Sequence, residues 1–255
     1  MNLLLSALLL AVPAPAGGLD HSRWDRVLKT YATLDSRVDY QNLKWNASKD
    51  LEPYVKELAA PWPSGLSVAE TKAALLNAYN ALAVHWIVLN YPQKSIWRTD
   101  NPFRNARHVL NGQPVSLDQI EARLREMKDP RIHAALVCAA RSCPPLRREA
   151  YVPDRLEEQL DDNTRVWLAD KRFNEFPPDG RVARVSEIFK WYAKDFQAAG
   201  GVKEFLARYA PVAIKNRKIE YLPYNWGLND ATPLGSDYSQ WDFYRDQLRL
   251  GLTGH

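Results

Sequence analysis

Apolar residues repeat at helical spacing in several parts of the chain. One set lies around residues 24–34 and another around residues 51–58. Their members are three or four positions apart: Trp24, Val27, Leu28, Tyr31 and Leu34, then Leu51, Tyr54, Val55 and Leu58. This spacing gathers the apolar side chains on one face of a helix. We therefore expect an amphipathic helix in each segment.

Two serine motifs mark the starts of further helices. Ser67 with Glu70, and Ser116 with Gln119, have the spacing of a capping box, in which each side chain pairs with the other residue's backbone amide. The helix after Ser67 continues to about Asn90 and is apolar on nearly every side, which predicts a buried helix. The helix after Ser116 has a single apolar face, formed by Leu117, Ile120, Leu124 and Met127.

Strand signals are short and few. Val109-Leu110 and Pro114-Val115 flank Asn111-Gly112, a dipeptide typical of a tight hairpin. The nearly unbroken apolar run from Ile132 to Ala140 predicts a buried strand, and shorter strands are expected at 181–185 and 219–222. Because helices dominate and no long linker interrupts the chain, the pattern predicts an α+β fold. We expect one helix-rich domain with a small, mostly antiparallel sheet.

The amino-terminal residues have the pattern of a signal peptide. Leu3 to Val12 form an apolar run, and Ala14-Pro15-Ala16 offers the small residues that precede a cleavage site. The run is too short to span a bilayer, so the protein is not expected to be integral to a membrane. No Lys or Arg precedes the run, and a buried first helix is the alternative. We predict a signal peptide at 1–16, a mature domain at 17–255, and export to the periplasm or the medium.

Composition excludes several classes of function. The 255 residues carry 34 basic and 30 acidic side chains, a net charge of +4 that is spread along the chain, so no nucleic-acid partner is expected. Two cysteines cannot build a disulfide scaffold or a four-cysteine zinc site. The five histidines have no ligand spacing, so we expect neither a metal nor a cofactor.

Three polar residues stand out on the buried helix that follows Ser67. At about 100° per residue, Asn77, Asn80 and His85 share an arc of about 140°. Burying unpaired amides and an imidazole is costly, so these groups must have partners. They either form a hydrogen-bond network with neighbouring backbone or belong to a functional site.

The helix after Ser116 carries one acid in an unusual place. Glu121 falls on the rim of the apolar face, where a solvated carboxylate has no need to be. An orienting role in a site is one interpretation. The alternative is an ion pair with Arg125, four residues further on.

The two cysteines flank a loop of small residues. On a regular strand His133 and Cys138 would point to opposite faces, about 16 Å apart, so we expect His85 rather than His133 to approach Cys138. Amides of the loop 139–144 can stabilise an oxyanion, and its Arg141 favours a thiolate. Alternatively, Cys138 is a core residue and Cys143 a packed thiol or its disulfide partner, which export would permit.

Several of these segments resemble the domain of unknown function 547 family. The resemblance covers most of residues 65–230 and rests on 77–85, 116–121, 133–146, 151, 159–161, 188–192 and 221–226. It implies a family domain with a papain-like, cysteine-hydrolase relationship. The family often has a histidine after the Ile-Glu pair, where this chain has Ala122. If that histidine is catalytic in the family, this chain is impaired.

The leading hypothesis is an exported cysteine-dependent hydrolase or acyltransferase that acts on an amide or ester bond. Cys138 is the predicted nucleophile, His85 its base, Glu121 the group that orients His85, and Asn80 a positioning residue. Cys143 is the alternative nucleophile.

Two other classes remain open. One is a non-catalytic exported module that binds a peptide or glycan in a groove lined by some of the nine tryptophans, twelve tyrosines and seven phenylalanines. The other is a thiol–disulfide protein, although Cys138 and Cys143 lack the Cys-x-x-Cys spacing. The expected partners are a peptide, a glycopeptide or a small thiol-reactive substrate.

Overall fold

A computed structural model describes residues 18–178 and 180–252 of the chain. The predicted signal peptide at 1–16 lies outside these residues and stays a prediction. The longer helices are α1 (Ser22–Tyr31), α2 (Tyr40–Asn46), α3 (Leu51–Ala59), α4 (Val68–Asn90), α5 (Leu117–Glu126), α7 (Leu156–Ala169), α9 (Val202–Tyr209) and α10 (Gln240–Arg249). Short turns of helix are η1 (Ile96–Arg98), α6 (Ile132–Ala135), η2 (Pro153–Arg155), α8 (Ile188–Trp191) and η3 (Asp195–Ala199).

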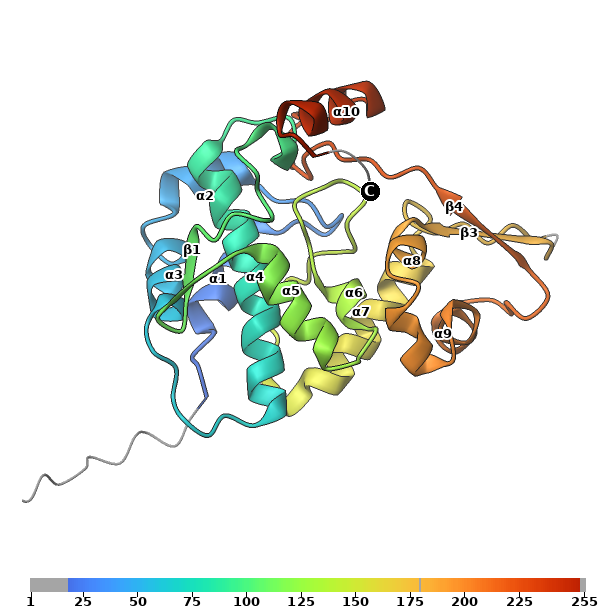
Figure 1. Cartoon of the computed structure of the whole chain (residues 1–255), viewed down its shortest axis with the longest axis horizontal. Helices are drawn as coiled ribbons and strands as arrows, with labels where there is room; N and C mark the ends of the chain where they lie inside the picture. Colours follow the sequence, from blue (N-terminus) through green and yellow to red (C-terminus); the bar gives the residue numbers. More distant parts are fainter. Residues whose placement is uncertain (1–17, 179, 253–255) are drawn as a thin grey trace, which may run out of the picture.

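Helix α4 is the centre around which the first half of the chain packs (Figure 1). Both halves of the predicted capping box are present at its start, because Ser67 Oγ accepts from the Glu70 amide and Glu70 accepts from the Ser67 amide. Helices α2, α3 and α5 pack against it. Its residues are buried on nearly all sides, as the apolar pattern predicted.

The two amphipathic helices are also confirmed, except that the first ends at Tyr31 and the predicted member Leu34 lies exposed beyond it. Trp24, Leu28, Tyr54 and Leu58 are buried on α1 and α3. In α5 the second capping box forms between Ser116 and Gln119. The apolar face of α5 is buried as expected, through Leu117, Ile120 and Leu124. No helix within residues 18–178 and 180–252 combines the length and apolarity needed to cross a bilayer.

The strands form two separate pairs. Strands β1 (His108–Leu110) and β2 (Gln113–Val115) make the predicted antiparallel hairpin, with His108 opposite Val115. Asn111 and Gly112 in its turn both have positive φ, which these residue types tolerate best. Strands β3 (Val182–Ser186) and β4 (Lys218–Leu222) pair in parallel at the far side of the molecule (Figure 1). The fold is α+β, with one antiparallel and one parallel pair.

The predicted strand from Ile132 to Ala140 is wrong. Ile132–Ala135 is a single helical turn, closed by the Leu136 amide on the Ile132 carbonyl, and the chain then extends into a loop. An isolated strand needs a neighbouring strand to satisfy its backbone. Here the side chain of Asn80 does so, accepting from the Val137 amide and donating to the Ala135 carbonyl.

Candidate functional site

The loop between the two cysteines is a tight structure held by a distant segment. Ala139 has a left-handed backbone conformation, with φ at 65°. The Arg141 amide donates to the Gly227 carbonyl at 2.8 Å, and the Asn229 amide donates to the Ala139 carbonyl at 3.0 Å. The Asn225 amide donates to Ser142 Oγ at 2.8 Å. The segment 225–229 therefore fixes the loop in one conformation.

This loop brings the two thiols into contact. Their Sγ atoms are 2.7 Å apart, and both cysteines are free. Cys143 Sγ also accepts from the backbone amides of Cys138, at 3.0 Å, and Ala140, at 3.3 Å. The hydroxyl of Tyr224 donates to it from 3.3 Å and lies 3.6 Å from Cys138 Sγ. Cys143 is buried, whereas Cys138 is partly exposed.

The surroundings separate the acidities of the two thiols. Burial opposes ionisation of Cys143, but hydrogen bonds from Cys138, Tyr224 and the loop amides outweigh it and lower its pKa. The hydrogen bond to Cys143, together with burial, raises the pKa of Cys138 well above its usual value. Of the two sulfurs, Cys143 is therefore the one whose deprotonated form the surroundings favour, and the pair titrates as a unit.

The two asparagines of α4 have reciprocal hydrogen bonds with backbone. Asn77 donates to the Tyr151 carbonyl at 2.8 Å and accepts from its amide at 2.9 Å. Asn80 does the same across Ala135 and Val137, at 2.9 Å each. The structure thus supports the interpretation that these two side chains form a hydrogen-bond network with neighbouring backbone. Asn80 nevertheless fixes the residue directly before Cys138.

Glu121 is partly buried at the rim of α5, where the helical pattern placed it. The alternative, an ion pair between Glu121 and Arg125, is not the main contact of Arg125. The guanidinium of Arg125 instead donates two hydrogen bonds to the carboxylate of Asp195, at 2.6 and 3.0 Å. Glu121 instead bonds to the hydroxyl of Tyr192. Burial raises the pKa of Glu121 to about 7, and the Tyr192 hydrogen bond only partly offsets this. Tyr192 also lies within electrostatic reach of Cys138, so this carboxyl and the thiols border one region.

His85 does not approach the cysteines, and this corrects the expected base. The carboxylate of Glu52 on α3 acts electrostatically on His85, and His85 acts in turn on His108 of β1. Asn80 and His85 are five positions apart, which is a rotation of about 140° around the helix, so their side chains point to different neighbours. Burial lowers the pKa of His85.

His133 has a structural partner on η3. Its Nε2 lies 2.9 Å from Asp195 Oδ2, and its ring stacks on Tyr192 with centroids 4.2 Å apart. Burial lowers its pKa, despite the nearby carboxylate. His133 and Cys138 were expected on opposite faces of a strand, but this segment is a helical turn followed by a loop, so that argument does not hold. Within the described parts of the chain, no three His, Cys, Asp or Glu side chains are grouped to hold a metal.

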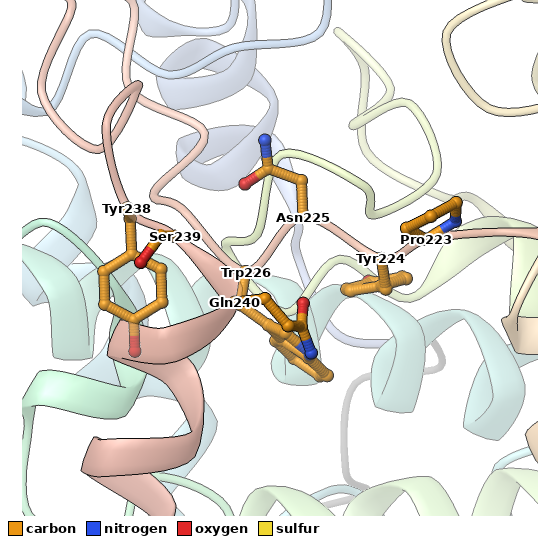
Figure 2. A pocket seen from close by; sticks show the side chains of 7 residues that line it. All are labelled: Pro223, Tyr224, Asn225, Trp226, Tyr238, Ser239 and Gln240. Carbon is orange, nitrogen blue, oxygen red and sulfur yellow. The ribbon is translucent and has the colours of Figure 1, made fainter.

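A pocket of about 310 Å³ is linked to the thiols through Tyr224, and Figure 2 shows the residues that line it. Tyr224 belongs to both, since its hydroxyl contacts the cysteines and its side chain lines the pocket. The lining residues carry no formal charge: Pro223, Tyr224, Asn225, Trp226, Tyr238, Ser239 and Gln240. Trp191 extends the aromatic surface, packing 4.8 Å from Tyr224 and 5.8 Å from Trp226, centroid to centroid.

Comparison with known families addresses the resemblance directly. Residues 63–168 match the model of a family described as a protein of unknown function, DUF547. This part of the chain belongs to the DUF547 family. The DUF547 segment contains all five predicted site residues, Asn80, His85, Glu121, Cys138 and Cys143. No curated protein and no solved structure is detectably similar to the chain, so the papain-like relationship stays a prediction.

Sequence reasoning missed two site residues, both of which lie beyond the DUF547 match. Tyr192 and Tyr224 reach the site from 188–192 and 221–226, segments that took part in the resemblance. Their aromatic side chains read as core residues in a sequence with many buried aromatics. Only the approach of their hydroxyls to Glu121 and Cys143 distinguishes them.

Proposed function

We propose that the protein is a thiol–disulfide oxidoreductase whose reactive pair is Cys138 and Cys143. The observation that carries the proposal is the 2.7 Å contact between their Sγ atoms. Two sulfurs so close, with one thiolate stabilised by amides and a tyrosine, are prepared to exchange a proton or to form a bond. The spacing differs from Cys-x-x-Cys, but the left-handed turn at Ala139 lets the two sulfurs come together as they do in that motif.

The two cysteines have different roles in the proposed reaction. Cys138 is the partly exposed sulfur and meets the substrate disulfide first, giving its proton to the Cys143 thiolate. Its attack breaks the substrate S–S bond, forms a mixed disulfide and expels one substrate thiolate, which takes the proton from Cys143 and leaves as a thiol. The Cys143 thiolate then attacks Cys138 Sγ, breaks the mixed disulfide and expels the second substrate sulfur as a thiolate, which takes a proton from water. The dithiol is oxidised by two electrons and the substrate disulfide is reduced by two.

A stoichiometric titration tests this order of events. Reduced protein is mixed with a small aromatic disulfide that releases a coloured thiol, and bound label is measured by intact mass. Wild type should release two equivalents of thiol and retain no label. Cys143→Ser should release one and keep the label on Cys138, whereas Cys138→Ser should react slowly because Cys143 is buried. Wild type that retains the label would overturn the proposal, as would two folded thiols that do not react.

A cysteine-dependent hydrolase or acyltransferase is the second candidate, and Glu121 is the observation that favours it. A carboxyl with a pKa of about 7 beside Tyr192 suits acid–base chemistry at neutral pH. In this reading Cys138 attacks the carbonyl and the Cys143 thiolate, rather than His85, takes its proton. An activated ester probe should then leave an acyl group on Cys138, and its removal should slow in Glu121→Gln. If neither chemistry occurs, the uncharged aromatic pocket supports the binding-module alternative.

We also propose export, on the evidence of the apolar run Leu3 to Val12 and the motif that follows it. Intact-mass measurement of the protein produced in its own cells should find Gly17 at the amino terminus. A cytosolic protein that retains Met1 contradicts this.

A further inference from the structure

Helix α10 carries an apolar stripe that stays largely exposed among the described residues. Trp241 is 83% exposed, Tyr244 53% and Leu248 70%. Their spacing of three and four positions places them on one side of the helix. Figure 1 shows α10 at the edge of the molecule, with one side free of other elements. The helix is firmly formed, because Ser239 and Asp242 make a complete capping box at its start.

The charges on α10 are segregated. Its two carboxylates face inward, where Asp242 lies 3.1 Å and Asp246 3.4 Å from Arg98. Arg245 also pairs with Asp242, and Arg249 with Asp246 at 3.9 Å. The carboxylate side chains are only 21% and 9% exposed, whereas the two arginines are 67% and 51% exposed. The more exposed charged side chains of this helix are therefore its two arginines, and they border the apolar stripe on one side.

We propose that this face of α10 docks the protein onto the surface of an anionic lipid bilayer. A tryptophan, a tyrosine and a leucine flanked by arginines are the side chains that lie in the headgroup region of membranes. A stable dimer generally buries about 800 Å² on each partner, more than three side chains supply. A bilayer needs no complementary protein surface, and its negative headgroups complement the exposed arginines. This association is peripheral and independent of the thiol chemistry.

Vesicle sedimentation tests the proposal with the full-length mature chain. Vesicles of phosphatidylcholine alone are compared with vesicles that contain about a third phosphatidylglycerol. Because each exposed Arg contributes to binding an anionic surface, we expect at least about fivefold more protein on the anionic vesicles, declining with added salt. The double variant Trp241→Ser/Leu248→Ser should lower binding by about fivefold or more. Fluorescence of Trp241, obtained by difference from Trp241→Phe, should shift to shorter wavelength on binding.

Leu34→Ser provides the matched control, since Leu34 is 88% exposed but lies far from α10 in the sequence. It should bind anionic vesicles like wild type, and far-ultraviolet circular dichroism should show that every variant folds. Binding that is equal on both vesicles, or unchanged in the double variant, overturns the proposal. A dimer that dissociates only in the double variant also overturns it and assigns the stripe to a second copy.

Discussion

The asparagines of α4 and the cysteines of the neighbouring loop lie in the same part of the interior but differ in their hydrogen-bond partners. Asn77 and Asn80 each donate to and accept from backbone that no strand satisfies. Cys138 and Cys143 instead contact each other, and one of them is partly exposed. Satisfied amides hold structure, whereas a thiol that shares a proton with a thiolate is available for chemistry.

The comparison also explains why the asparagine network lies beside the thiols. Asn80 fixes Val137, and the segment 225–229 fixes Ala139 and Arg141 on the other side of Cys138. Sulfur atoms are held in contact only when the backbone on both sides is rigid. The satisfied region therefore supports the reactive one, and substitutions should separate stability from thiol chemistry.

The largest expected effect is on stability. Asn77→Ala leaves the buried amide and carbonyl of Tyr151 without partners, which should lower the free energy of unfolding by about 2–4 kcal/mol. Urea denaturation measures the loss, and thiol labelling of the folded variant should match wild type. Asn46→Ala, at an exposed position of α2, should change stability by less than about 0.5 kcal/mol. Slowed labelling in Asn77→Ala would remove the distinction between the two regions.

Glu121 should make stability depend on pH. Its pKa is raised to about 7 from 4.5, so the folded state binds its proton more tightly than the unfolded state. Stability should therefore fall as pH rises from about 4.5 to about 7, by about 2–3 kcal/mol in total. Glu121→Gln should lack this fall and be the more stable protein above pH 7.

Glu126→Gln serves as the control for that experiment, because Glu126 is an exposed residue of the same helix. Its stability should follow the pH dependence of wild type. Identical pH profiles for wild type and Glu121→Gln would mean that the carboxyl is hydrated in solution.

A smaller effect is expected from the tyrosine that donates to the thiolate. Tyr224→Phe removes the hydroxyl 3.3 Å from Cys143 Sγ and should raise the pKa of the thiol pair by about one unit. The ultraviolet absorbance of the thiolate, followed against pH, measures the shift. Tyr221→Phe, at a half-exposed position of β4, should leave the titration unchanged. An unshifted titration in Tyr224→Phe would show that the loop amides alone stabilise the charge.

The smallest effect should come from replacing His85, the residue predicted from the sequence to be the base. His85→Ala should leave the pH midpoint of cysteine labelling unchanged, since His85 interacts electrostatically with Glu52 and His108 rather than with the thiols. Labelling rate against pH with iodoacetamide is the measurement. A shift of one unit or more would restore His85 to the site.

Local patterns were sufficient for most of the helices. Capping boxes at Ser67 and Ser116 and the turn Asn111-Gly112 depend only on neighbouring residues, and all three formed as expected. The run from Ile132 to Ala140 failed because an apolar segment of that length suits either a strand or a buried turn. Hydrogen bonds from Asn80, more than fifty residues away along the chain, stabilise the turn and loop instead of a strand.

The sequence by itself determined the α+β class, the buried helix with its polar amides, the rim position of Glu121 and the choice of the two cysteines as the reactive candidates. Its motifs also pointed to the DUF547 family, whose model matches residues 63–168 of the 65–230 over which the resemblance was expected. Only the tertiary structure decided that the cysteines touch, that Tyr224 and Tyr192 complete their surroundings, and that His85 faces elsewhere. Periodicity and capping act over a few residues and can be read along the chain. Contacts between distant segments depend on how the whole chain packs, so no local pattern encodes them.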